Sequence, residues 1–326
     1  TRPGAVAPLG RREFPVLKGT ITSATGHLGA FELGITDYAL PLPSSRAAYV
    51  FGPSRESAPS TCDLVVDVSG GTPLFPAHDL RPGYLRADPR DPLAVERLIG
   101  RAADLVGEFD KPRYISFNQG LCAHSRSRKT GCTRCLDLCP TGAITPAGDT
   151  VAIDPHVCAG CGSCAAACPT GAAAYALPAA DALLRKLRTL VQAYRTAGGG
   201  APVILFHDAG HGVPLIEAAA RFGAGLPADV IPVEVSEIFQ IGPELLAGLY
   251  AYGVSGVRIL GRAKPKHDTA GLRATLEMTE RVVSALGYGT GTLGLIETDD
   301  PDALRAALDA APRGQAAREP ASFLPM

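Results

Sequence analysis

The residues best suited to chemistry in this chain are its cysteines, and they are not evenly spread. Eight of the nine lie between Cys122 and Cys168, and the ninth is Cys62. Four of them form the uninterrupted pattern C-x2-C-x2-C-x3-C-P: Cys158, Cys161, Cys164 and Cys168. Thiols this close cannot usefully cross-link distant segments, but they can converge on a metal ion or cluster. The spacing favours a cluster over zinc, which usually takes two C-x2-C pairs across a longer loop.

The cysteine segment contains an internal repeat. The sequence CTRCLDLCPTGAI at 132–144 recurs as CGSCAAACPTGAA at 161–173, which is a shift of 29 residues (161 − 132). The same shift leads from Cys158 back to Lys129, and the unmatched Cys122 lies seven residues earlier (129 − 122). We interpret this offset as an insertion between the first and second thiols of the first copy, which gives C-x9-C-x2-C-x3-C-P.

With both copies in place, residues 122–173 resemble the two-cluster 4Fe–4S domain of bacterial ferredoxins. In that pattern the first three cysteines of a run bind one cluster and the fourth binds the other. The resemblance implies the ferredoxin fold, one-electron transfer at low potential and no catalysis by the domain itself. It also implies two 4Fe–4S clusters with crossed ligands, namely Cys122, Cys132, Cys135 and Cys168 for cluster one, and Cys158, Cys161, Cys164 and Cys139 for cluster two.

Two questions stay open around the inserted residues 123–131. Cys122 could be a buried free thiol, which would leave a three-cysteine site that holds a 3Fe–4S cluster or recruits another ligand such as His124. The insertion is also basic, with Arg126, Arg128 and Lys129, and Arg134 follows it. These charges are either a solvated face, the usual role of a charge run, or they lie over the anionic cluster or steer an acidic partner.

Composition, charge and missing motifs argue against a nucleic-acid-binding protein, a membrane protein and several classes of enzyme. The 326 residues are 46% hydrophobic and 19% charged, an ordinary globular balance. A net charge of −1 does not favour nucleic acid or an acidic membrane surface as the main partner. We see no apolar run that could span a bilayer and no signal peptide, so we expect a cytoplasmic protein. No nucleophile elbow, Walker loop or H-E-x-x-H motif is present, which favours a non-catalytic subunit over an enzyme.

We expect a multidomain α/β and α+β fold with three domains. Residues 1–118 form an α/β or β-rich domain with a helix over 91–109, and 119–178 form the two-cluster domain. The apolar face of that helix is expected to carry Val95, Leu98, Ile99, Ala102 and Val106. Residues 179–326 alternate helical and strand patterns, which is typical of a parallel sheet with helices packed on it, and end in a tail of about fifteen residues.

The last domain resembles the delta-subunit family that accompanies methyl-viologen-reducing hydrogenase and heterodisulfide reductase. The similarity lies in PVEVS at 232–236, GPELLA at 242–247 and GVSGVRILG at 253–261. That family carries the cysteines of a 2Fe–2S cluster at its strand ends. This chain reads HDAGH at 207–211, followed by Val235-Ser236 and Gly261-Arg262, so we expect no cluster there. The whole arrangement also resembles ferredoxin-like proteins found next to formate dehydrogenases, which would make the chain the C-terminal half of a longer protein.

Other motifs carry weaker signals. HDAGHG at 207–212 follows a strand and precedes a helix, where an α/β sheet can bind an anion or metal through His207, Asp208 or His211, although a small-residue turn is the favoured interpretation. GTGTLG at 289–294 follows a helix and opens a strand, so it is not a dinucleotide loop. Cys62 is expected to be a buried thiol.

The sequence as a whole predicts an iron–sulfur electron-transfer protein. Its flanking domains would dock it to a larger oxidoreductase, such as a formate dehydrogenase-like or hydrogenase-like complex. A second hypothesis places a flavin or nucleotide in the α/β domain, with the clusters supplying electrons to it. A third is an assembly or scaffold factor whose clusters are structural.

Overall fold

The computed structural model describes residues 14–46, 48–317 and 320–321. The first unit begins with a three-stranded antiparallel sheet. Strand β1 (Lys18–His27) pairs antiparallel with β2 (Ala30–Ala39), and β3 (Ala58–Cys62) extends this sheet. A parallel pair, β4 (Val65–Asp67) and β5 (Tyr84–Arg86), is followed by α1 (Pro92–Ala103), and the short η1 (His78–Leu80) precedes β5. A small core unites the elements: Phe31, Val65, Phe75 and Tyr84.

The described residues divide into two units between Phe109 and Asp110. The expected boundary at 118 lies later, after β6 (Ile115–Phe117), which pairs with a strand of the cysteine-rich segment. The helix expected over 91–109 begins at Pro92, with Asp91 capping the Ala94 amide, and ends at Ala103. Its expected apolar face is wrong in part, because only Leu98 is buried, whereas Ile99 is 60% and Val106 is 84% exposed.

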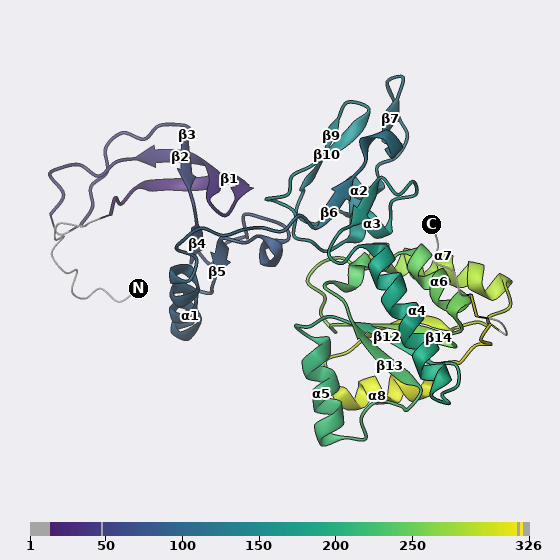
Figure 1. Ribbon diagram of the computed structural model, residues 1–326. Coiled ribbons are helices and arrows are strands. Elements are labelled where there is room, and N and C mark those ends of the chain that lie inside the picture. Colours follow the sequence, from purple (N-terminus) through teal and green to yellow (C-terminus); the bar gives the residue numbers. More distant parts are fainter. Residues whose placement is uncertain (1–13, 47, 318–319, 322–326) are drawn as a thin grey trace. The chain divides into compact units, whose positions relative to one another are not determined.

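The second unit begins with the cysteine-rich segment, which consists of short elements (Figure 1). After β6 come η2 (Gln119–Leu121) and a small hairpin of β7 (Ser125–Arg126) and β8 (Lys129–Thr130). Helix α2 (Arg134–Leu138), the antiparallel pair β9 (Ile144–Ala147) and β10 (Thr150–Ile153), helix α3 (Ser163–Ala166) and β11 (Ala173–Tyr175) follow. Both helices end before a Cys-Pro pair, since the residue before proline is driven out of the helical region.

The two strand pairs of this segment are copies of one another. Cys122 and Cys158 are 36 residues apart (158 − 122), and adding 36 to the residue numbers of β6 gives residues 151–153 of β10. Adding the 29 residues of the repeat to β9 gives the position of β11. Under these steps the pair Phe117–Ala173 becomes the pair Ile153–Ile144, so the two registers are the same. The steps differ by seven residues (36 − 29), and the hairpin β7–β8 takes up this insertion without shifting either strand pair.

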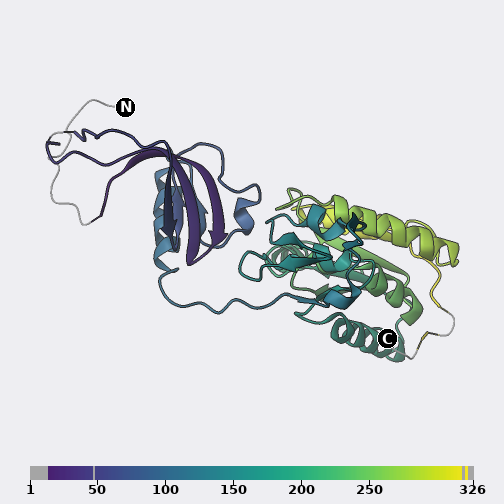
Figure 2. The ribbon, with the colours of Figure 1, turned by 90° about the horizontal axis from the view of Figure 1, so that it is seen from above.

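The remainder of the second unit is a three-layer α/β domain, as Figures 1 and 2 show. Its four strands are all parallel in the order β13-β12-β14-β15, which confirms the predicted parallel sheet. Their bounds are β12 (Val203–His207), β13 (Val230–Glu234), β14 (Gly256–Gly261) and β15 (Leu293–Glu297). One face packs on three helices, α4 (Ala180–Thr196), α6 (Pro243–Tyr252) and α7 (Ala270–Ala285). The other packs on two, α5 (Gly212–Phe222) and α8 (Pro301–Ala310).

The chain after α8 is tied back to the α/β domain over the residues that the structure describes. The Gly314 amide donates to the Ser255 carbonyl at 2.6 Å, and Arg313 pairs with Asp229 at 2.9 Å. The buried Arg258 of β14 donates to the carbonyls of Gly291 and Thr292. Residues 318–319 and 322–326, which belong to the expected tail, lie outside the described residues. Within the described ranges, no helix is long and apolar enough to cross a membrane.

The cysteine-rich segment packs directly on the α/β domain through η3 (Ile238–Gln240), which follows β13. Gly162 has a φ of 87°, and a Cβ built on it would lie 2.6 Å from the Cβ of Gln240. A Cβ on Gly271 of α7 would lie 2.8 Å from Leu138 of α2. The Ser236 hydroxyl adds a hydrogen bond to the Leu177 carbonyl at 2.9 Å. These approaches leave no room for larger side chains, so the two parts form one packed body.

The close approach at Gly162 is testable by adding one methyl group. We expect Gly162→Ala to lower the free energy of unfolding of the second unit by about 2 to 4 kcal/mol, because left-handed strain and overlap with Gln240 add together. Gly142→Ala is the matched control: it also has a positive φ, but nothing lies within 4 Å of its Cβ position. It should cost only about 1 kcal/mol. Equal losses in denaturant unfolding of the two variants would show that the packing against η3 is not tight.

Candidate metal centre

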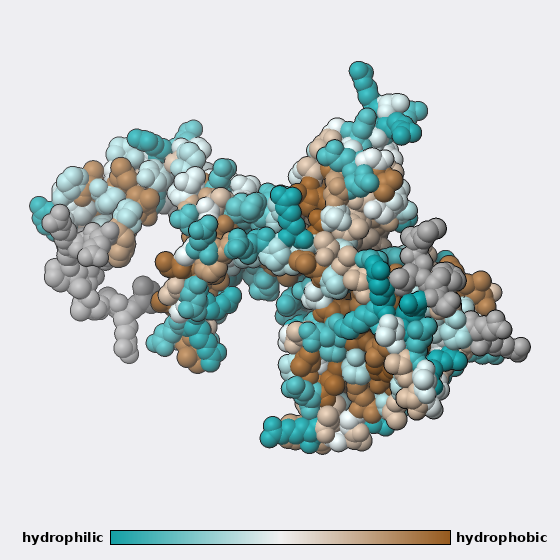
Figure 3. All heavy atoms as spheres, viewed as in Figure 1, coloured by the Kyte–Doolittle hydropathy of each residue, from teal (hydrophilic) through white to brown (hydrophobic). Residues whose placement is uncertain are grey.

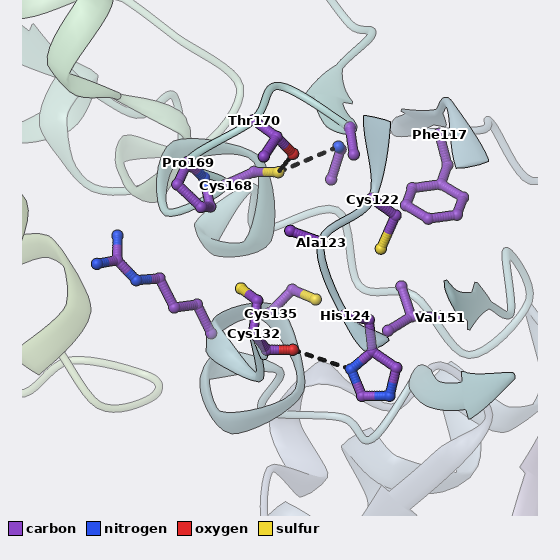
Figure 4. Close-up of a pocket in the computed structure, with 13 residues that line it drawn as sticks. Phe117, Cys122, Ala123, His124, Cys132, Cys135, Val151, Cys168, Pro169 and Thr170 are labelled. Carbon is purple, nitrogen blue, oxygen red and sulfur yellow. Dashed lines mark hydrogen bonds between the residues drawn. The ribbon is translucent and has the colours of Figure 1, made fainter. Parts of the chain in front are cut away.

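The structure brings four cysteines from three separate segments around one cavity, which we call cavity one. Cys122 follows η2, Cys132 and Cys135 lie at the start of α2, and Cys168 follows α3. Figure 4 shows these side chains around a common space, with Phe117 and Val151 closing one side. All four cysteines are partly exposed. Cys122 therefore lines the same cavity as the three cysteines with which the spacing grouped it.

A second cavity, which we call cavity two, has the corresponding construction. It is lined by Cys158, Cys161 and Cys164, which come from the loop before α3 and from α3 itself, and by Cys139, which follows α2. Apart from Thr141 and Ser163, its other lining side chains are apolar or absent, and no Lys or Arg is among them. Cys164 is buried at 8% exposure. Each cavity thus takes three cysteines from one copy of the repeat and the fourth from the other.

The two helix ends explain how the fourth cysteine is delivered. Helix α2 carries Cys135 inward, and Cys139 at its C-terminus adopts an extended conformation before Pro140. The chain therefore leaves the helix at Cys139 and turns its thiol to cavity two. Cys168 stands in the same place after α3, one 29-residue step later, and turns to cavity one. Crossing of the two sets follows from this exit at proline.

Burial makes four of these eight thiols resist ionisation. It raises the pKa of Cys158, Cys161 and Cys164, and neighbouring cysteine charges raise the pKa of each further. The pKa of Cys135 is raised in the same way, by burial first and then by the charge of Cys132. Deprotonated sulfurs at these positions therefore need compensating positive charge, which is what a bound metal centre supplies.

The pKa of Cys168 is shifted in the opposite direction, because hydrogen bonds favour its thiolate. Burial by itself would raise its pKa, but hydrogen bonds from the backbone amides of Ala173 and Thr170 outweigh burial and lower it. The Ala173 amide lies 3.5 Å from the sulfur, and the Thr170 hydroxyl lies 3.7 Å from it. Donors of this kind also tune the potential of a cluster bound through the sulfur.

Sequence reasoning missed these threonines, although the repeat contained the signal. Thr141 occupies the same place beside Cys139, with its hydroxyl 3.7 Å from the sulfur. The threonine recurs with the third cysteine in each Cys-Pro-Thr-Gly-Ala copy, two residues after it. The two cysteines that bind across the repeat, Cys139 and Cys168, therefore each have a threonine hydroxyl beside the sulfur, from Thr141 and Thr170. A repeated polar residue that has no role in core packing was the available clue.

His124 is tied to the backbone at the base of the β7–β8 hairpin. It is buried at 6% exposure and lines cavity one, and its Nδ1 lies 2.9 Å from the Cys132 carbonyl (Figure 4). Because a carbonyl only accepts, Nδ1 carries the proton and donates. The Gly131 amide donates back to the His124 carbonyl at 2.8 Å. These bonds close the insertion, so that Cys122 and Cys132 stay beside each other despite nine intervening residues.

The other sequence candidates lie outside the cavities. His211 is the residue before α5; its backbone amide donates to the Asp208 carboxylate at 2.6 Å, and its Nε2 lies 3.0 Å from Asp299. Gly289 and Gly291 form a loop between α7 and β15, and the Gly291 amide donates to Glu280, as expected of a connecting turn. Cys62 ends β3 in the first unit and is partly buried.

The donor set fits a 4Fe–4S cluster in each cavity. Thiolates are the ligands that such clusters require, and each cavity is lined by four of them. Among the described residues, no three His, Cys, Asp or Glu side chains lie close enough together to hold a single metal ion.

Comparison with known proteins agrees with this chemistry. Residues 129–172 match the family model described as a 4Fe-4S dicluster domain. No curated protein matches the chain. The match covers the second to fourth cysteines of the first copy and all four cysteines of the second, and it begins after Cys122 and most of the hairpin insertion. The cysteine-rich segment is therefore an iron–sulfur domain that binds 4Fe–4S, with a role in electron transfer.

Proposed function

We propose that the chain carries electrons through two 4Fe–4S clusters to or from a larger oxidoreductase. Cluster one is bound by Cys122, Cys132, Cys135 and Cys168, and cluster two by Cys158, Cys161, Cys164 and Cys139. The observation that carries this proposal is the pair of four-cysteine cavities built by one repeated unit with one register. A structural zinc site would not need two cavities whose ligand sets are exchanged between the copies.

The residues of the chain have distinct tasks in this function. A bound 4Fe–4S cluster accepts and releases one electron. The crossed cysteines fix both centres to the same two helix ends, so that they remain close neighbours. Thr170 and the Ala173 amide stabilise negative charge on the sulfur of Cys168, which favours the more reduced state of its site. The apolar walls of cavity two limit access of water.

The flanking domains support a role as a subunit rather than a free carrier. The α/β domain is packed on the iron–sulfur domain through η3 and α7, so any protein that binds this domain is held at a fixed place relative to the cysteines. We infer that the domain docks the chain to oxidoreductase subunits of the formate dehydrogenase-like or hydrogenase-like class, in line with its resemblance to hydrogenase delta subunits.

One observation favours a second function for the α/β domain. Its strand order places a topological switch point between β12 and β14, where α/β sheets commonly bind ligands outside the carboxyl ends of the strands. Strand β13 leads from this edge into η3, which contacts α3 of the iron–sulfur domain. A flavin or nucleotide bound at this edge would lie on the side of the cysteines. Its presence in native protein would favour the redox-enzyme alternative.

Metal analysis of cysteine variants tests the ligand assignment. Anaerobically isolated protein should contain about eight iron and eight sulfide per chain. Cys122→Ala should lower the iron content and give the paramagnetic signal of a three-iron centre, because one ligand of cavity one is lost. Cys62→Ala is the control and should keep full iron. About four iron, or zinc in place of iron, would refute the two-cluster assignment, and full iron in Cys122→Ala would exclude that thiol as a ligand.

Redox titration separates electron transfer from a structural role. We expect the native protein to take up about two electrons per chain, reversibly, at the low potentials typical of ferredoxins. Titration with a mediator series and paramagnetic resonance would measure this. Clusters that are destroyed on reduction, or that cannot be reduced near these potentials, would instead support the scaffold alternative.

A further inference from the structure

We propose that the β7–β8 hairpin is the docking site for a redox partner with an acidic protein surface, which exchanges electrons at cavity one. This inference rests on the proposed function and adds to it the chemistry of the partner and the cluster that the partner meets. The hairpin is defined by residues 123–131, between Cys122 and Cys132.

The hairpin presents unneutralised positive charge. Arg126, Arg128 and Lys129 are all exposed, and the hydrophilic tip of the hairpin is visible in Figure 3. In the described part of the chain, these three and Arg134 form no ion pair. Asp149 contacts the hairpin through its backbone carbonyl, which accepts from the Ser125 amide. The Asp137 carboxylate, three residues after Arg134, accepts from the Thr133 hydroxyl.

The turn holds arginine where a smaller residue would cost less. Ser127 and Arg128 have φ values of 52° and 62°, the left-handed pair of a two-residue hairpin turn that favours Asn and Gly. A residue with a Cβ is strained in this region, because the Cβ approaches the backbone carbonyl oxygen too closely. The strained turn directs a charged side chain outward at the tip, which a solubilising surface would not require.

The charge is rigidly connected to cavity one. The hairpin begins at Cys122 and ends at Cys132, and the bonds of His124 to the Cys132 carbonyl and from the Gly131 amide close its base. Arg134, which lines the same cavity, adds a fourth cation. A protein bound to the hairpin is therefore held within a few residues of two cysteines of the site.

Cavity two has no comparable group of cations, since only Lys111, which donates to the His156 carbonyl, acts on Cys158 from outside the lining. No Lys or Arg lines it, Cys164 is buried, and the adjoining Gly162 and Leu138 pack on the α/β domain. The repeat is otherwise the same, so the insertion and its charges distinguish the two ends of the electron path. Electrostatic steering by such a patch raises association rates with oppositely charged partners and is weakened by salt.

Two cobalt complexes of opposite charge test the inference on the intact, cluster-loaded protein. Each takes one electron from the reduced protein, Co(III) becomes Co(II), and no proton moves. At low ionic strength, the triple variant Arg126→Gln, Arg128→Gln, Lys129→Gln should be oxidised about tenfold more slowly by the trianion trisoxalatocobaltate(III), and faster by the trication hexaamminecobalt(III). Stopped-flow absorbance measures both rates.

A matched variant removes the same charge elsewhere. Lys186→Gln, Arg221→Gln, Arg281→Gln alters three exposed cations on α4, α5 and α7, and should change both rates by less than about twofold. If the two triple variants respond alike, the hairpin is not the site of exchange. Iron content and reducibility are measured on the same samples. If the wild-type protein cannot be reduced, both the proposed function and this inference are wrong. If the hairpin variant has normal iron content and its two oxidation rates equal those of the wild-type protein, only this inference is wrong.

Polyglutamate is the probe for an acidic protein surface. It should slow oxidation by the trianion in wild-type protein and in the matched variant, but not in the hairpin variant. Equal inhibition of all three would refute docking at the hairpin. Single-stranded RNA that inhibits more strongly than polyglutamate at equal charge would replace the acidic protein with a nucleic acid as the partner.

Discussion

Mutual repulsion and desolvation of closely packed thiols is the constraint on which the cysteine-rich domain depends. Four sulfurs around one cavity cannot all lose their protons in a poorly hydrated site unless positive charge is bound between them, as the raised pKa values of Cys158, Cys161 and Cys164 indicate. The proline turns, the threonine hydroxyls and the exchanged fourth cysteine all serve to hold these groups in place. The domain is therefore organised around its ligand positions and has only a small core of its own.

The repeat determines both strand pairing and ligand exchange. The register of β6 with β11 is the register of β10 with β9, moved along the chain. An insertion inside one copy could have disturbed this equivalence, because a one-residue slip turns every side chain to the other face of a strand. The hairpin avoids the problem, since its ends are joined by His124 and Gly131 before the chain reaches α2.

The sequence predicted the chemistry better than the packing. Spacing, together with the resemblance to two-cluster ferredoxins, grouped Cys122 with three cysteines that line the same cavity in the structure. Alternation of helix and strand patterns predicted the parallel sheet. Helical periodicity misjudged Ile99 and Val106, because it cannot tell which apolar residues of an amphipathic stretch meet a neighbour or where the helix stops. The contact of Gly162 with Gln240 joins residues that are far apart in the sequence, so local sequence patterns do not predict it.

The two-residue turn of the inserted hairpin limits how this part of the chain can vary. A hairpin closed in this way lengthens by one residue on each strand at a time, because any other change alters the turn or shifts the pairing at its base. The gap between the first two cysteines would then change in steps of two, from nine residues to seven or eleven. If related sequences have gaps of seven, nine or eleven residues between these two cysteines, their hairpins differ in length at the tip. The cysteines at the base of the hairpin would then keep the same positions.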